Sequence, residues 1–258
     1  MGQLSFLPLP LKARGCNGLC PLPPTFFPYP HTPLRTSPPF MLIEQPPRLL
    51  RWLYPRALWR MDPSERAVFL TFDDGPIPHV TPWVLEVLAH YGIHATFFMV
   101  GDNIRKHPEE FRQVVAAGHT VGNHTFHHIS GHIHGDFHFT TDVEDCQHLI
   151  DEGIRSIIPH HRRPVDELPL FRPPHGWMKR AQYAYVAKHY RVVMWDLVTR
   201  DYSMRLDADD VLDNVRRYAR NGSIITFHDS LKSIGKLRTA LPAAIEWLRD
   251  EGYEFRTL

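Results

Sequence analysis

Short apolar runs alternate with longer segments of helical periodicity from residue 67 to the last residue given. Short apolar runs that end in glycine, proline or polar residues are typical of buried strands, whereas apolar positions repeating every three or four residues indicate helices. The predicted strands are 67–72, 95–100, 119–122, 168–171, 190–195, 223–227 and 253–255. The predicted helices are 80–91, 108–117, 141–157, 178–189, 208–220 and 237–251.

Regular alternation of strands and helices predicts an α/β fold in which helices cover a parallel sheet. About seven strand and helix units suit a barrel better than an open sheet. No internal repeat is visible, and no apolar run approaches the roughly 20 residues that a membrane-spanning helix needs. We therefore predict a single barrel domain over residues 67–258 and no membrane span.

Residues 1–40 are rich in proline and show neither helical nor strand periodicity, which predicts a disordered extension. A signal peptide needs an unbroken apolar stretch, but the apolar stretch 4–11 is short and contains Pro8 and Pro10. We therefore expect no cleaved signal peptide and a cytoplasmic location.

Residues 41–66 are predicted to form a lead-in segment, with a short amphipathic stretch at 49–54. Because the composition changes at Met41, we hypothesise that residues 1–40 are a mis-assigned upstream extension and that Met41 is the natural start. An intact mass that includes Met1, measured on protein from its native locus, would contradict this hypothesis.

The charge of the chain is balanced, with 29 basic and 28 acidic side chains among 258 residues and a formal net charge of +1. This balance disfavours nucleic acid or an anionic membrane surface as the main partner. Three cysteines, an odd number, argue against a disulfide framework. Histidine is frequent, with 18 in the chain, which weakly favours metal binding.

Reactive side chains follow five of the predicted strands. They are Asp73 and Asp74 after the first strand, His124 to His128 after the third, Arg172 after the fourth, Asp196 to Asp201 after the fifth, and His228 with Asp229 after the sixth. All strands of a parallel barrel end on one face, so these side chains are expected to share a site. Residues scattered over a surface would fall at both ends of the strands.

Asp73 and Asp74 are adjacent carboxylates at the end of an apolar run and directly before Gly75 and Pro76. Neighbouring side chains on a strand point to opposite faces, but a turn at Gly75 relaxes this alternation, so both acids could face one pocket. Alternatively, they belong to a solvated turn, for which Asp-Asp-Gly is an ordinary sequence.

His124 and His128 lie four residues apart, a spacing that places two imidazoles on one side of a helical turn and allows both to bind one metal ion. With Asp74 they make a set of two histidines and one carboxylate, which suits catalytic zinc or a similar ion. Spacing alone leaves other candidates and a solvated histidine-rich loop open. The other candidates are His127, His132, His134 and His138.

Arg172 precedes two prolines, and a rigidly held arginine is suited to bind a carboxylate in a bidentate way, so we expect it to pair with Asp73. His228 is the natural general acid or base, because imidazole titrates near neutral pH. Either Asp196 or Asp201 could hydrogen-bond to it. The alternatives are a structural salt bridge for Arg172, a buried structural histidine and surface acids.

Five motifs in this order resemble those of the polysaccharide deacetylase family, the NodB-homology domain of carbohydrate esterase family 4. They are Thr71-Phe72-Asp73-Asp74-Gly75, His124-Thr125-Phe126-His127-His128, Arg172-Pro173-Pro174-His175-Gly176, Asp196 through Asp201-Tyr202, and His228-Asp229. The resemblance covers residues 67–258. It implies a distorted (β/α)7 barrel and metal-dependent removal of an acetyl group from an N-acetylated sugar, in peptidoglycan or a chitin-like oligosaccharide.

The resemblance also implies a role for each matching residue. Asp73 resembles the catalytic base, Arg172 the residue that tethers it, His228 the catalytic acid and Asp201 the partner that orients this acid. The metal ligands implied are Asp74, His124 and His128. The expected ion is Zn²⁺, with Co²⁺, Ni²⁺ or Mn²⁺ as alternatives.

Two positions depart from the family pattern: His175 stands where an aromatic residue is more usual, and Thr226 where an apolar residue commonly lines the acetyl-methyl pocket. A related amidase acting on a small amide or cyclic imide is the alternative enzyme. A carbohydrate- or metal-binding module that has lost turnover is the non-enzyme alternative, although a base, an acid and a ligand set are all present.

Overall fold

The computed structural model describes residues 44–161, 163–164 and 167–258. The predicted disordered extension at 1–40 and the proposed start at Met41 lie outside these residues. Within the described part, no helix is long and apolar enough to cross a membrane.

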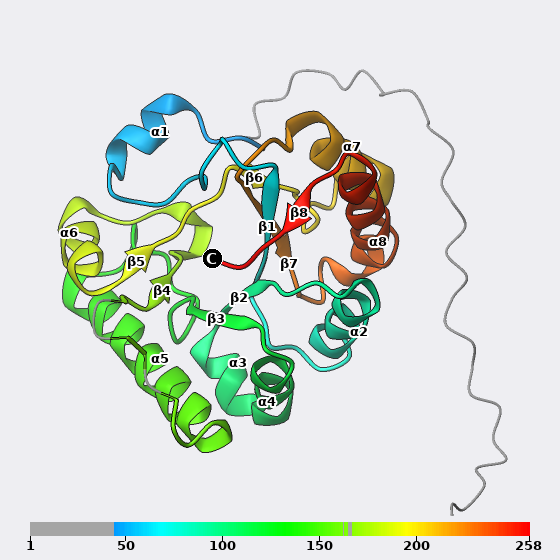
Figure 1. The fold of residues 1–258 in the computed structure, drawn as a ribbon. Coiled ribbons are helices and arrows are strands. Elements are labelled where there is room, and N and C mark those ends of the chain that lie inside the picture. Colours follow the sequence, from blue (N-terminus) through cyan, green and yellow to red (C-terminus); the bar gives the residue numbers. More distant parts are fainter. Residues whose placement is uncertain (1–43, 162, 165–166) are drawn as a thin grey trace, which may run out of the picture. The chain divides into compact units, whose positions relative to one another are not determined.

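In the described part of the chain, eight parallel strands form one curled sheet with helices around its outside (Figure 1). Seven strands follow the order β5-β4-β3-β2-β1-β7-β6, and β8 pairs with β1. The strands are β1 (Ala67–Asp73), β2 (Thr96–Met99), β3 (Thr120–Asn123), β4 (Leu170–Phe171), β5 (Arg191–Val192), β6 (Leu197–Val198), β7 (Ser223–His228) and β8 (Glu254–Phe255). This arrangement confirms the predicted α/β barrel.

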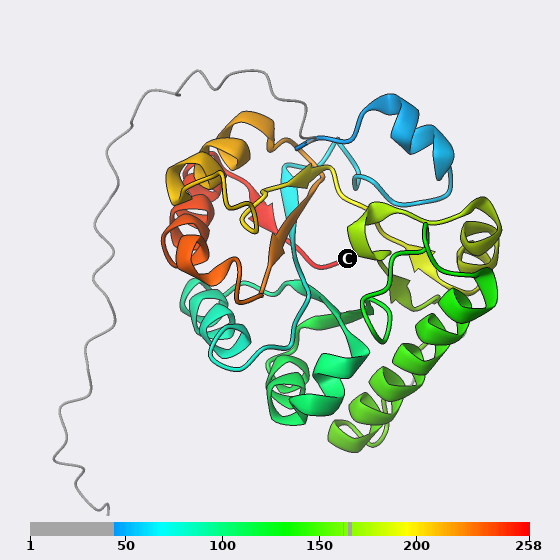
Figure 2. The same cartoon turned by 180° about the vertical axis from the view of Figure 1, so that it is seen from behind.

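The helices lie around the outside of the curled sheet, with α5 and α6 near β4 and β5 and with α2, α7 and α8 at the opposite part of the ring, near β1 and β7 (Figures 1 and 2). They are α1 (Arg48–Leu53), α2 (Thr81–Tyr91), α3 (Gly101–Lys106), α4 (Pro108–Ala116), α5 (Asp136–Ile157), α6 (Arg180–His189), α7 (Ala208–Tyr218) and α8 (Ile234–Asp250). The sequence did not predict α3 or β6. Both are too short for a periodic signal, and β6 exists through its pairing with β7.

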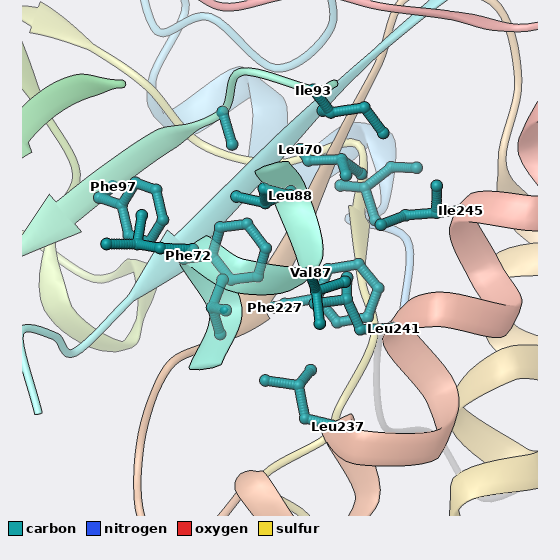
Figure 3. Close-up of a cluster of buried hydrophobic side chains, with 14 of the residues drawn as sticks. Leu70, Phe72, Val87, Leu88, Ile93, Phe97, Phe227, Leu237, Leu241 and Ile245 are labelled. Atoms are coloured by element: carbon teal, nitrogen blue, oxygen red, sulfur yellow. The ribbon is translucent and has the colours of Figure 1, made fainter. Parts of the chain in front are cut away.

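Strand β1 is buried along its whole length, and its side chains alternate between two apolar environments. Val68, Leu70 and Phe72 face the covering helices, where the ring of Phe72 stacks between those of Phe97 and Phe227 at 5.0 and 5.9 Å (Figure 3). The continuous apolar run of β1 therefore reflects burial on both faces, which is typical of parallel sheets.

The other face of β1 points into the barrel. Ala67 and Phe69 pack there in one apolar cluster with side chains from or next to other strands, namely Phe98, Leu170, Val193 and Ile224. Thr71 and then Asp73 follow on this face, so the interior changes from apolar to polar toward the carboxyl ends of the strands. The charged side chain on this face, Asp73, therefore lies at the carboxyl end of β1.

The lead-in segment links the edge strand β5 to the residues at the start of β7. Leu58 N–H donates to Val192 O and Met194 N–H donates to Leu58 O, both at 2.8 Å, while Met61 N–H donates to Gly222 O at 2.8 Å. The segment thus satisfies backbone groups that neighbouring strands would otherwise pair.

Asp196 is fully buried and binds the lead-in segment to the barrel. Its carboxylate accepts hydrogen bonds from Arg51 at 2.8 Å, from Arg220 Nε at 2.8 Å and from Ser223 at 2.9 Å. Burial alone would raise the pKa of Asp196, but the donors from Arg220, Arg51 and Ser223 hold it below its usual value. Asp196 is therefore a structural residue of the lead-in segment.

We expect Asp196→Asn to lower the free energy of unfolding by about 1–3 kcal/mol, because the buried cluster loses its charge-assisted hydrogen bonds. Urea denaturation measures this change. Asp213→Asn is the control, since the ion pair that Asp213 forms with Arg216 is long, at 3.5 Å, and its loss should cost less than about 0.5 kcal/mol. Equal effects of the two substitutions would contradict the assignment.

Candidate active site

The predicted site residues meet at the carboxyl end of the barrel. In the parallel pairing of β1 with β7, Asp73 lies directly beside His228. Asp74 has a left-handed backbone conformation with φ of 80°. This conformation interrupts the alternation of side chains along the strand, so the two adjacent carboxylates can face the same pocket. The sequence predicted this effect from the turn at Gly75.

Arg172 lies inside the barrel and is 1% exposed. Its Nη1 donates to Asp73 Oδ1 at 2.6 Å and to Thr71 Oγ1 at 2.8 Å, and its Nη2 donates to Met194 O at 2.8 Å. Burial lowers the pKa of Arg172, while the Asp73 carboxylate acts in the opposite direction. The predicted pair is present, and it holds one oxygen of Asp73 in place.

Asp74, His124 and His128 each offer one ligand atom, and these atoms all lie within 4.8 Å of one another. Asp74 Oδ1 is 3.2 Å from His128 Nε2 and 3.8 Å from His124 Nε2. Burial alone would raise the pKa of Asp74, but the imidazoles of His128, His228 and His124 hold it well below its usual range. The carboxylate is therefore ionised, as a ligand must be.

His124 is oriented as a metal ligand would be. Its Nδ1 donates a hydrogen bond to Arg172 O at 2.8 Å, which leaves Nε2 as the acceptor facing Asp74. Burial lowers the pKa of His124 to about 4, so the ring is neutral at physiological pH. Two imidazoles and one ionised carboxylate fit a divalent cation with positions left for water and substrate.

The structure separates the other histidine candidates from this triad. His127 is directed away from the triad by a 2.6 Å bond between its Nδ1 and Asp142 Oδ1, and His134 Nδ1 bonds to Ser130 O at 2.8 Å. Among the described residues, the only metal-competent group of three or more side chains is the Asp74 triad. Sequence spacing could not make this distinction.

His228 ends β7 and is bound by Asp201 from the loop after β6. Asp201 Oδ1 accepts from His228 Nδ1 at 2.8 Å, and Oδ2 accepts from the backbone N–H of His228 at 2.8 Å. Burial alone would lower the pKa of His228, but the Asp201 carboxylate raises it to about 9. Of the two predicted partners, Asp201 is the one that contacts His228, whereas Asp196 binds Arg51 of the lead-in segment.

Asp229 has a positioning role that the sequence did not reveal. It is completely buried, and its carboxyl group accepts from Gly75 N–H at 3.1 Å and from the Thr81 hydroxyl at 2.6 Å. A Cβ on Gly75 would lie 2.1 Å from Asp229 Oδ2, so only glycine fits. Asp229 thus secures the turn that carries Asp73 and Asp74.

Asp142 on α5 secures the loop that carries the histidines, residues 124–128, which we call the histidine loop. Its buried Oδ2 accepts from the backbone N–H groups of Phe126 and His127 at 2.8 and 2.9 Å. Thr125 and His128 in this loop have positive φ values of 63° and 54°. Asp142 lies 15 to 16 residues from the backbone groups that it binds, so the local spacing of residues could not predict its role.

The two departures from the family pattern have different surroundings. The His175 ring contacts the His128 ring edge to face at 4.9 Å, and burial lowers the pKa of His175. Thr226 lies inside the barrel, where its hydroxyl is 3.2 Å from that of Thr71. His175 therefore adjoins the triad, whereas Thr226 belongs to the interior polar layer.

The fold and the site together define a parallel α/β-barrel hydrolase that pairs a cation-binding triad with a tethered carboxylate and a carboxylate-bound imidazole. A family model described as polysaccharide deacetylase matches residues 60–193. The chain belongs to the polysaccharide deacetylase family. The predicted enzyme class, a hydrolase of this family, is confirmed.

Similar proteins with established names cover most of the chain. A peptidoglycan-N-acetylglucosamine deacetylase of Bacillus cereus is 30% identical, over 78% of this chain and 90% of its own length. A chitooligosaccharide deacetylase of Rhizobium leguminosarum bv. trifolii is 32% identical, over 76% of this chain and 91% of its own length.

Solved structures show the same fold. A peptidoglycan N-acetylglucosamine deacetylase superimposes with a TM-score of 0.71 at 25% identity, covering 81% of this chain and 94% of that one. PdaA of Bacillus subtilis, a family 4 carbohydrate esterase, gives 0.67 at 25% identity over 84% and 91%. The NodB-type barrel predicted from the motifs is confirmed.

We expect Asp229→Ala to lower the free energy of unfolding by about 1–3 kcal/mol, because Gly75 N–H and the Thr81 hydroxyl lose their buried acceptor. Asp229→Asn should cost clearly less. Burial raises the pKa of Asp229 to about 8, so the native side chain is mostly neutral at pH 7, and asparagine keeps a neutral acceptor. Thermal unfolding compares the two, and equal destabilisation would contradict the role.

Proposed function

We propose that this chain removes N-acetyl groups from a glycan containing N-acetylglucosamine and releases acetate and a free amine. One observation carries the proposal: Asp73, bound to Arg172, lies beside His228, bound to Asp201, next to the triad. Amide hydrolysis needs a base for the attacking water and an acid for the departing nitrogen. The names of the relatives in Bacillus cereus and Rhizobium support a sugar amide as substrate.

Asp74, His124 and His128 would hold a divalent ion, and their nitrogen and oxygen donors suit Zn²⁺, with Co²⁺, Ni²⁺ or Mn²⁺ as alternatives. When bound, the ion supplies positive charge that polarises the acetyl carbonyl and makes a water more acidic. The chain contributes a neutral imidazole at His124 and an ionised carboxylate at Asp74, so neither must lose a proton first.

Asp73 and His228 move the protons. Arg172 binds Oδ1 of Asp73, and the second carboxylate oxygen can take a proton from the attacking water. Asp201 holds the Nδ1–H of His228, so Nε2 is the ring nitrogen that can donate a proton to the departing amine. The C–N bond breaks as that proton is transferred, and the acetyl carbon keeps the oxygen of the water.

The direct test is acetate release from chitooligosaccharides, peptidoglycan fragments, small amides and cyclic imides. We expect release from the N-acetylated glycans, loss of release after chelation and recovery on adding Zn²⁺. Full activity after complete metal removal would contradict the triad's role. Turnover of small amides or imides without turnover of any glycan would instead identify the alternative amidase.

We expect Asp73→Asn to lower kcat by about 10²- to 10⁴-fold, the usual contribution of a general base. Bound zinc, measured by elemental analysis, should remain stoichiometric because Asp73 is assigned no place among the ligands. Undiminished turnover in this variant would overturn the assignment of the base.

The pH profile tests the acid. Because the proton donor must be protonated and the pKa of His228 is raised to about 9, kcat/KM should fall as pH rises through this region. Asp201→Asn removes the carboxylate that raises this pKa, so the alkaline fall should move to lower pH. An unmoved alkaline limb would show that another group sets it.

A further inference from the structure

A groove runs between α1 and α6 and reaches the loop after β4. Its volume is about 620 Å³, and we call it the α1–α6 groove. The side chains that characterise it are two tryptophans and three basic residues, namely Trp52, Trp177, Arg56, Arg180 and Lys188. In Figure 2, α1 lies beside α6 at this edge of the barrel.

The two tryptophans are unusually open to solvent, with Trp52 at 82% and Trp177 at 46% exposure. An indole ring offers a large flat apolar face, and the apolar face of a pyranose ring packs well against it. Two such rings along one groove suit a chain of sugars better than a single small molecule.

The charged side chains that line the groove are all basic. Arg56, Arg180 and Lys188 are exposed, no acidic residue lines the groove, and none of the three forms an ion pair with a described residue. Arg51 on α1 differs, because its guanidinium is bound to buried Asp196 at 2.8 Å. Guanidinium and ammonium groups that have no acidic partner among the described residues, placed around an aromatic groove, favour a ligand that carries carboxylates.

The walls of the groove are held in place before any ligand binds. The Tyr54 hydroxyl accepts from Met178 N–H at 2.8 Å and donates to Met178 O at 2.9 Å, beside Trp177. The Tyr183 hydroxyl accepts from Arg56 N–H at 2.8 Å. A groove built this way loses little conformational entropy on binding.

The groove also adjoins the candidate active site. Trp177 lies two residues after His175, which places their Cα atoms within about 7 Å of each other. The His175 ring contacts that of His128, a member of the triad, at 4.9 Å. His132, four residues after His128, lines the groove as well. A short oligosaccharide can therefore reach from the triad into the groove.

We propose that the α1–α6 groove binds the part of the glycan next to the sugar that is deacetylated, and that this part carries carboxylate groups. This inference rests on the proposed function and deepens it. The substrate class is an N-acetylated glycan with acidic substituents, as in a peptidoglycan strand, rather than a neutral chitin-like oligomer. The tryptophans contact the sugar rings, and the three basic side chains pair with the acids.

The test compares the native protein with an Arg180→Gln/Lys188→Gln double variant on two substrates of equal length. One is an oligosaccharide of N-acetylglucosamine and N-acetylmuramic acid, and the other is neutral chitotetraose. We expect KM for the acidic substrate to rise about 5- to 10-fold, the value of two exposed charge pairs, with kcat unchanged. KM for chitotetraose should stay within about twofold.

Arg155→Gln is the matched control, because Arg155 is an exposed basic residue in the last turn of α5, as Lys188 is in α6. It should change neither KM. Equal changes on both substrates, or no change on either, would overturn the inference. So would loss of binding to phosphatidylglycerol vesicles in the double variant without any loss of glycan selectivity, which would assign the charges to a membrane surface.

A binding titration separates this inference from the proposed function. Tryptophan fluorescence of the Asp73→Asn protein reports glycan binding without turnover, and Trp52→Ala in that background should remove much of the signal. Preferential binding of the acidic oligosaccharide supports the groove even if no acetate is released. Acetate release with equal affinity for both oligosaccharides supports the function and overturns the groove.

Discussion

The buried ion pair between Arg172 and Asp73 is the interaction on which the site depends. Arg172 crosses the barrel interior, packs over the Phe98 ring at 4.1 Å and bonds to Thr71, Met194 O and Asp73. Desolvating such a pair is costly, so its main effect is to specify one geometry rather than to add stability. The backbone of the same arginine also orients His124, because Arg172 O accepts the hydrogen bond from His124 Nδ1. One residue thus holds both the carboxylate and a ligand of the triad.

Adjacent acids can have separate roles here because the backbone changes conformation between them. Asp73 completes β1 and faces Arg172, whereas Asp74 has a positive φ and faces His124 and His128. The unfavourable left-handed conformation is supported from outside the turn by Asp229. Positive φ values at Thr125 and His128 show the same principle in the histidine loop, where Asp142 provides the support. The strained backbone conformations therefore occur where the chain brings reactive side chains together.

The sequence predicted the barrel, the face that carries the site and the Arg172 pair, because buried strands and their polar ends leave a strong local pattern. Spacing alone could not choose between His127 and His128, or between Asp196 and Asp201, since those choices depend on contacts with distant residues such as Asp142 and Arg51. The resemblance to the family indicated His128 and Asp201. The positioning role of Asp229 was not predicted for a similar reason: its carboxyl group accepts a hydrogen bond from Gly75 N–H, 154 residues away. The short elements α3 and β6 have too few residues for a periodic signal, and β6 needs β7 to exist.

The central claim is that Asp74 binds the ion together with His124 and His128, while Asp73 stays on Arg172. Anomalous X-ray diffraction from crystals of the zinc-loaded protein tests it most directly. We expect one zinc peak at about 2.0–2.2 Å from Asp74 and from Nε2 of both histidines, with Asp73 still bound to Arg172. A zinc ion on Asp73, or one bound by His127 or His132 in place of the triad, would contradict the account.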